Sequence, residues 1–289
     1  MPGWAPEFPG GWIRPRLRRY GTVSGTVPSG YPAYARIFHP GEAQLLSWRG
    51  SHPVSEEQVL RWSGLAKLRG TTAHPLMQWP ALLAGHRNPG YGEPGWQYHE
   101  PRQGSLPQEE LAAISRVLAK HSPGTEITAG LWEGYAWIHG GDAVATLELS
   151  SWSRGGDQSA ADPDLESGPE FQPPPTPAVL PFEVRTGPKL ELPDRAYFLF
   201  AGALSLFEDR LWQVRSGWDG DGTPNLLWPT DRSWCLASEI DFDSTIVGGS
   251  ADLIRDLLAC PEIEALPVPA DGDLTAFADH INEGPGSVG

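Results

Sequence analysis

Apolar residues recur three or four positions apart in five segments of this chain, which is the spacing that buries one side of a helix. The clearest repeat is carried by Leu111, Ile114 and Leu118. The pattern predicts helices over residues 55–68, 75–85, 105–121, 250–259 and 273–282.

Serines mark the starts of several of these helices. Ser55 and Ser105 each precede a glutamine by three positions, which is the spacing of a capping box. Ser250 stands directly before the fourth repeat and is a typical N-cap residue. Gly70 and Pro261 follow two of the repeats, where they are expected to end the helices.

Elsewhere apolar and other residues alternate, and a period of two is typical of strands. The alternation predicts strands over residues 34–38, 127–138, 143–149, 178–185, 195–204, 211–215 and 234–243. Because strands follow strands, we expect an α+β fold with a mainly antiparallel sheet and four to five packed helices. The first 30 residues, rich in Gly, Pro, Trp and Arg, are expected to form an irregular arm.

Residues 153–177 contain almost no apolar residues. This composition is typical of a mobile loop or a linker. Neither side of the segment alone shows a complete sheet. We therefore expect a single domain over residues 1–289 with a mobile insertion at about 153–177, and two lobes over 1–152 and 178–289 as the less favoured alternative.

The chain has a formal net charge of −15, which is concentrated in its second part. Residues 131–289 contain 8 lysines and arginines against 27 acids, whereas residues 1–130 contain 13 against 9. An acidic surface repels phosphate, which argues against nucleic acid and favours a basic protein as the partner. The exception is a basic cluster that is either a solvated arm or a contact for a polyanion: Arg14, Arg16, Arg18 and Arg19.

The two cysteines, Cys235 and Cys260, cannot form a disulfide framework. Two buried free thiols are expected, and one disulfide is the alternative. No apolar run approaches the ~20 residues of a membrane span, and the N-terminal segment lacks the apolar core of a signal peptide. We expect a cytoplasmic protein with no membrane partner.

The most informative segment for function is the last predicted strand. Its alternation would place Glu239, Asp241 and Asp243 on one face. Three carboxylates in a row repel one another unless water, a cation or a basic side chain offsets their charge, and Arg232 and Arg255 are the local candidates. The row is either the wet face of a sheet or an acidic site for a divalent cation or a basic ligand.

Several residues follow as candidates for chemistry at this site. Asp241 and Asp243 are candidate metal ligands, and oxygen ligands suit Mg²⁺ or Ca²⁺ better than zinc. As an enzyme, the protein would use the three acids in catalysis, with Arg232 and His39 as helpers. His39 ranks first among the eight histidines because it follows a ring-rich strand and precedes a proline.

Tryptophan is frequent, with 13 in the chain. Most of these rings are expected in the core. Trp228 and Trp234 are candidates for a platform on which a ligand stacks, and Asp231 between them is a candidate contact. The sequence contains no phosphate-binding loop, dinucleotide fingerprint, nucleophile elbow or zinc spacing.

Two segments, SGYPAYARIFHP and WPTDRSWCLASEIDFDSTIVGGS, lie at residues 29–40 and 228–250. They resemble uncharacterised actinobacterial proteins of similar length. The resemblance covers both ends of the chain, so it supports a single domain. It implies no substrate, cofactor or catalytic residue, because no activity is known for that group.

Two hypotheses for function follow. The favoured one is a non-catalytic cytoplasmic binding protein, regulatory or immunity-like, whose acidic half engages a basic partner. The alternative is an enzyme that uses Glu239, Asp241 and Asp243 with a divalent cation or as an acid/base pair. A concave pocket around these acids would favour the enzyme, and open water would favour the binding protein.

Overall fold

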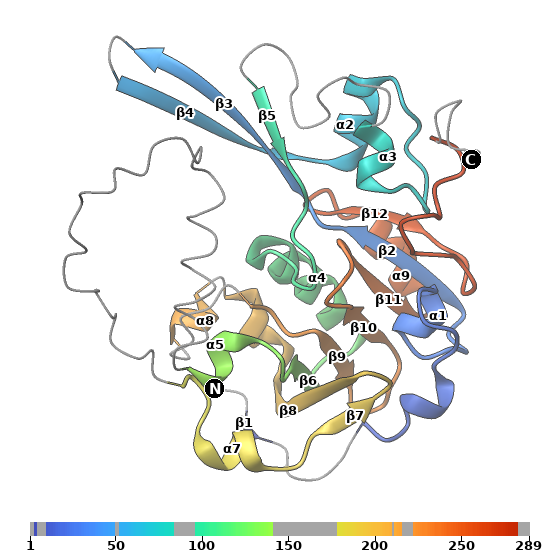
Figure 1. Ribbon diagram of the computed structural model, residues 1–289. Coiled ribbons are helices and arrows are strands. Elements are labelled where there is room, and N and C mark those ends of the chain that lie inside the picture. The colour runs from blue at the N-terminus through green and yellow to red at the C-terminus, as the bar shows by residue number, and fades with distance from the viewer. Residues whose placement is uncertain are drawn as a thin grey trace, which may run out of the picture.

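The structure is a computed structural model of the chain, and it describes residues 3–4, 10–49, 52–83, 96–140, 178–209, 211–215 and 222–282. It combines helices with two antiparallel sheets (Figure 1), so the predicted α+β class with mainly antiparallel pairing is confirmed. The predicted strands at 143–149 and the insertion at 153–177 lie outside the described residues. The single-domain interpretation stays a prediction.

Most of the strands belong to one sheet. Its strands are β1 (Gly3–Trp4), β2 (Ala33–Phe38), β6 (Glu126–Trp132), β7 (Leu190–Leu192), β8 (Arg195–Ala203), β9 (Leu226–Pro229), β10 (Cys235–Ser238), β11 (Ser244–Gly249) and β12 (Glu264–Pro267). They pair in the order β1-β8-β6-β9-β10-β11-β2-β12, and β7 pairs with β8. The predicted strands at 34–38 and 195–204 are confirmed as β2 and β8.

The described residues contain more helices than the four to five expected, because many are single turns. The α-helices are α1 (Val23–Thr26), α2 (Trp62–Arg69), α3 (Trp79–Leu83), α4 (Gln108–His121), α5 (Ala136–His139), α7 (Phe182–Thr186), α8 (Trp212–Arg215) and α9 (Ala251–Leu258). Two short 3-10 turns, η1 (Arg14–Arg16) and η3 (Leu204–Glu208), complete the set.

Both faces of the large sheet are buried. Helices α4 and α9 pack on one face, where Leu111 and Leu257 meet Trp234 and Leu236 of the sheet segment around β10. On the other face, residues 10–31 and the chain near Leu274 cover the side that carries Cys235. Strand β10 is therefore buried on both sides, and the predicted wet face of this strand is wrong.

The second sheet is smaller and pairs in the order β4-β3-β5, with β3 (Gly41–Arg49), β4 (His52–Leu60) and β5 (Trp96–His99). In Figure 1 the β3–β4 hairpin projects from the body of the molecule, and α2 and α3 lie beside the sheet. Ala43 and Tyr98 pack with Trp62 of α2 and Trp79 of α3. One face of this sheet is thus core, and the other is left open.

The predicted helix at 55–68 is wrong in its first half. Residues 52–60 form β4, which pairs with β3 along its whole length, and helix α2 begins only at Trp62. Val59, Trp62 and Ala66 have the spacing of one helix face, but only Trp62 and Ala66 are buried, and Val59 is 70% exposed. The pairing with β3 overrides a helical spacing that three apolar residues happened to share. Gly70 ends α2 in the left-handed conformation, as predicted.

The predicted helix at 273–282 is wrong because two aspartates bind the main chain locally. The Asp273 carboxylate accepts a hydrogen bond from the Thr275 N–H group, and the Asp279 carboxylate accepts from Ile281 and Asn282. Such bonds compete with the helical ladder. Leu274 and Ala278 are buried all the same, whereas Phe277 is exposed.

Three strand predictions also fail locally. In the predicted strand 178–185, residues 182–186 instead form α7 directly after Pro181. In the predicted strand 211–215, residues 212–215 form α8, and the Asp209 carboxylate accepts a hydrogen bond from the Leu211 N–H group just before it. The strand predicted over 127–138 ends at Trp132, and α5 follows. By contrast, α4 and α9 form as predicted, although α4 starts after Pro107 and its expected cap Ser105 bonds to Thr223 instead.

Candidate functional site

The three acids that the sequence singled out do not lie on a strand. Strand β10 ends at Ser238, and residues 239–243 form the turn that leads into β11. The Phe242 N–H group donates to the Glu239 carbonyl, which closes the turn. The predicted row of three carboxylates on one strand face is therefore wrong, because a reverse turn points them in different directions.

Two of the acids share one arginine that the sequence did not suggest. Arg195, the first residue of β8, donates from Nε to Glu239 Oε1 at 3.0 Å and from Nη2 to Asp241 Oδ2 at 2.6 Å. Its Nη1 donates to the Asp194 carbonyl at 2.9 Å. The Tyr20 hydroxyl donates to the same Asp241 oxygen at 3.1 Å. We call Arg195, Glu239, Asp241 and Tyr20 the Arg195 cluster.

The third acid turns the other way, toward the core. Asp243 Oδ1 lies 3.4 Å from Nη2 of Arg36, a β2 side chain that is fully buried. Arg36 also donates to the Ser244 hydroxyl and to the carbonyls of Pro75 and Met77. Burial lowers the pKa of Arg36 to about 10, which leaves it charged at neutral pH. This arrangement joins β2, β11 and the segment before α3, and its role is structural.

The predicted metal ligands Asp241 and Asp243 are thus held by different arginines. Among the described residues, no three histidine, cysteine or acidic side chains gather in a way that would hold a metal ion. The site predicted for Mg²⁺ or Ca²⁺ does not form from these residues in this part of the chain. Arg232 and Arg255 do not offset the acids either, since Arg232 lies over the Trp12 ring and Arg255 pairs with Asp252.

His39 lies in the core and not beside the Arg195 cluster. Its Nδ1 lies 2.7 Å from the Arg102 carbonyl, which can only accept, so Nδ1 carries the proton. Its Nε2 therefore accepts from the Thr245 hydroxyl at 2.8 Å, and the Thr245 oxygen accepts from Ser238 at 2.6 Å. Burial lowers the pKa of His39 to about 4, so the ring is neutral at neutral pH.

The two candidate rings are core residues. Trp228 and Trp234 are each 1% exposed, and Trp234 donates from Nε1 to the Ser122 hydroxyl. The predicted stacking platform is therefore wrong for these rings. Asp231 accepts from the Ser233 N–H group and shapes the turn between β9 and β10.

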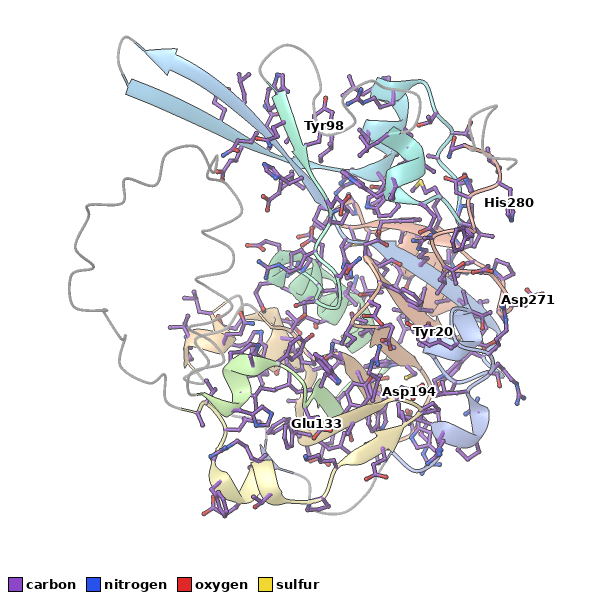
Figure 2. All side chains as sticks on the ribbon, in the orientation of Figure 1. Tyr20, Tyr98, Glu133, Asp194, Asp271 and His280 are labelled. Carbon is purple, nitrogen blue, oxygen red and sulfur yellow. The ribbon has the colours of Figure 1, made fainter. Side chains whose placement is uncertain are left out.

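A small cavity of about 90 Å³ lies beside the Arg195 cluster. Residues 17–26 and the turn from β7 to β8 line it from two sides, Tyr197 and Ala237 line it from the sheet, and Glu239 lines it from the turn after β10. Tyr20 and Asp194, labelled in Figure 2, lie on these two opposing segments. Burial raises the pKa of the Glu239 carboxyl, and Arg195 opposes that shift.

A larger cleft of about 660 Å³ opens on the free face of the small sheet. Its floor includes Glu42 of β3 and Val59 of β4, which are paired with each other and are both exposed. Its walls are the chain after β5 and the first turn of α4, which lies below β5 in Figure 1. We call this the acidic cleft, because it is lined by Glu42, Glu100, Glu109 and Glu110 against one basic residue, Arg102.

The sequence analysis did not identify Arg195 as the partner of Glu239 and Asp241, and it did not predict the acidic cleft at all. Arg195 stands 44 positions from Glu239 in the chain, so no local pattern joins them. The acidic cleft collects glutamates from β3, the end of β5 and α4, and the helix prediction over residues 55–68 hid the sheet that forms its floor. The only signal present was the pair of acids in the first turn of α4.

Both cysteines are free thiols, as expected, with Cys235 buried in β10 and Cys260 partly exposed after α9. In the described residues no helix combines the length and the apolar character that a membrane span requires. Compared with known proteins, the chain matches no protein-family model, no curated protein and no solved structure.

Proposed function

We propose that this protein is a non-catalytic binding protein that takes up a basic segment of a partner protein in the acidic cleft. The observation that carries the proposal is the lining of the cleft, which contains four glutamates and one arginine. A concave surface of one charge sign raises the local concentration of oppositely charged groups and steers their approach. At about 660 Å³ the cleft is also much larger than the cavity of about 90 Å³ beside the Arg195 cluster.

The acids of the cleft fall into two kinds. Glu109 and Glu110 lie in the first turn of α4, where carboxylates stabilise the helix by offsetting its dipole. Glu42 lies on β3 and Glu100 directly follows β5, and both are exposed. Neither belongs to α4, so stabilisation of that helix does not explain their presence. These two residues support a role in recognition.

Gln108 adds a second reason to expect an occupant. It lines the same cleft, and its side-chain N and O atoms are both covered without a hydrogen-bond partner among the described residues. A buried amide that makes no hydrogen bond costs about 1–3 kcal/mol. The backbone of a bound peptide offers both an N–H donor and a carbonyl acceptor. A rotated Gln108 side chain could accept from that N–H group and donate to that carbonyl.

The enzyme hypothesis receives less support from the geometry. It required three acids together, and Asp243 is paired with a buried arginine away from the other two. Of the three acids only Glu239 lines the small cavity, so the pocket around the acids that would favour an enzyme does not form from all three. The proposed helper His39 is enclosed in the core and hydrogen-bonded at both ring nitrogens.

An anionic partner such as nucleic acid would meet repulsion in the acidic cleft.

A lysine-rich peptide tests the proposal by isothermal titration calorimetry. We expect binding at about 25 mM salt that weakens strongly at about 300 mM, because exposed charge pairs are screened. The variant Glu42→Gln/Glu100→Gln should weaken binding roughly three- to tenfold. The matched control, Glu126→Gln/Glu183→Gln, removes the same charge from exposed positions outside the cleft and should bind like the parent.

An equal loss in both double variants would show that only the total charge matters and would contradict a specific cleft. Binding that does not respond to salt would contradict the electrostatic basis of the proposal.

A further inference from the structure

Strand β4 forms one edge of the small sheet. The strands pair in the order β4-β3-β5, so within the described residues β4 is paired on one side only. In an antiparallel pair, alternate residues point their N–H and C=O groups away from the partner strand. Among the described residues, no backbone–backbone hydrogen bond reaches residues 56–60 from outside the sheet. A row of main-chain donors and acceptors is therefore open along this part of β4.

This edge is long and regular. Nine consecutive residues of β4, from His52 to Leu60, pair with β3 from Arg49 back to Gly41 without a bulge. Natural edge strands are usually short, bulged or covered, because a regular edge is a template for another strand. In Figure 1 the hairpin projects from the body of the molecule, and β4 is its outer strand. The geometry is thus that of a strand to which another strand can be added.

We propose that this edge takes up a basic segment of a partner protein, which adds to β4 as a further strand of the small sheet. The inference goes beyond the proposed function, because the acidic cleft lies on the face of the sheet and the added strand would lie beside it. The two surfaces adjoin at Val59, which lines the cleft and is exposed. They share the charge of the partner, but each can fail without the other.

The charge of β4 selects the partner. Glu56 and Glu57 are consecutive and exposed, so one carboxylate lies on each face of the strand. The strand contains no lysine or arginine. The described contacts of these acids include no basic side chain, and Glu57 accepts from the neutral amide of Gln44 at 3.4 Å. Basic side chains opposite the two acids would form favourable cross-strand pairs, so a run of consecutive lysines or arginines fits both faces.

A second copy of this chain is a poor occupant of the same edge. If two β4 strands paired antiparallel over their whole length, Glu56 would lie opposite Glu56. A shift by one residue would place Glu56 opposite Glu57 twice. Like charges directly opposite one another destabilise a sheet. The two acids therefore disfavour self-association and leave the edge open to a strand of opposite charge.

Octalysine, which is about as long as β4, tests the main-chain pairing by calorimetry with the full chain at about 25 mM salt. Two modified forms have the same charge and the same number of N-methyl groups, which remove N–H donors. In one form every second residue is methylated, so one edge of the peptide keeps all its donors. In the other form the middle residues are methylated consecutively, so both edges are interrupted.

We expect the alternating form to bind within about threefold of unmodified octalysine and the consecutive form to bind at least tenfold more weakly. Equal affinities of the two methylated forms would overturn the proposal, because a cation held by charge alone does not distinguish them. Absence of binding by octalysine would overturn it as well. Saturation with octalysine should also slow amide hydrogen exchange in residues 52–60, and unchanged exchange there would contradict an added strand.

A double variant tests the charge of the edge. Glu56→Gln/Glu57→Gln should weaken the binding of octalysine about two- to tenfold. The matched control is Glu126→Gln/Glu183→Gln, which removes the same charge from exposed positions on β6 and α7 and should bind like the parent. An equal loss in both double variants would mean that the acids of β4 do not select the partner.

The variant Glu42→Gln/Glu100→Gln separates this inference from the proposed function. If the two methylated forms still differ in affinity for this variant, the edge of β4 binds without the acidic cleft. If they bind the parent alike while the loss of Glu42 and Glu100 still weakens octalysine, the acidic cleft stands and the added strand is refuted.

Discussion

The turn between β10 and β11 sends its acids to two arginines whose surroundings differ. Asp243 meets Arg36 in the core, where the arginine side chain is 1% exposed, whereas Glu239 and Asp241 meet Arg195 at the surface, where it is 18% exposed and Asp241 is 57% exposed. The buried pair ties three segments together. The surface cluster borders a cavity of about 90 Å³, so the same turn has one end held in the core and one end at the surface.

This comparison predicts that the two arginines differ in their contributions to stability. Replacing Arg36 by Met leaves Asp243 and the carbonyls of Pro75 and Met77 without their donor. We expect the free energy of unfolding to fall by about 3–5 kcal/mol, as when one partner of a buried ion pair is removed. Urea denaturation measures the effect. A loss under about 1 kcal/mol would mean that the buried end of the turn is no more structural than the exposed end.

The buried end should also respond to acid through His39. Its pKa is lowered from 6.5 to about 4 in the folded protein, so the unfolded chain binds more protons between these values. The stabilising contribution of the neutral His39 is therefore present in full above about pH 6.5. As the pH drops from 6.5 toward 4, the free energy of unfolding falls by about 3 kcal/mol on account of this residue. The raised pKa values of Glu239 and Asp243 act in the opposite direction.

A variant isolates the histidine from those acids. His39→Gln keeps a donor and an acceptor but removes the titration, so its stability should depend less on pH over this interval than that of the parent. Denaturation at a series of pH values gives both slopes. Parallel slopes would contradict a neutral, buried His39.

Arg195 should matter less for folding. Arg195→Met should lower the free energy of unfolding by about 1–2 kcal/mol, because the Asp241 side of the cluster is screened by solvent and only Glu239 is left partly buried. Adding Glu239→Gln to this variant should recover part of the loss, since the amide needs no counter-charge. A double-mutant cycle measures the coupling, and a loss that equals that of Arg36→Met would remove the distinction between the two ends.

The smallest effect is expected at Tyr20. Its hydroxyl bond to Asp241 lies at an exposed position, so Tyr20→Phe should change stability by about 0.5 kcal/mol or less. Urea denaturation measures the change, and a loss of more than about 1 kcal/mol would contradict a bond that solvent screens.

How far the sequence predicted this structure depended on whether the signal was local. Strand β2 was predicted from its alternation, and helix α9 was predicted from its serine cap. Both signals lie within the element itself and do not depend on a distant partner. The segment EIDFD has the alternation of a strand, but the antiparallel pairing of Ser238 with Thr245 requires a connection there. A turn and a strand can carry the same alternation, so the pattern alone does not separate them.

The partners of the acids were beyond any local pattern. Arg36 lies 207 positions from Asp243, and it stands in the middle of an apolar strand where a charged side chain is unusual. That exception was the one available hint, because a buried arginine needs an acid somewhere in the fold. Arg195 opens β8 at the surface, where a charged residue is ordinary, and it gave no such hint.

The free thiol of Cys235 offers a way to time the opening of the sheet. The residue is completely buried in β10, and burial raises its pKa, so a reagent that alkylates thiolates reaches it only when β10 is exposed. Cys260, which follows α9, is only partly buried, so we expect its thiol to react faster in the folded chain. The difference in labelling rate between these two native cysteines therefore reads the opening of the sheet directly, without an introduced label.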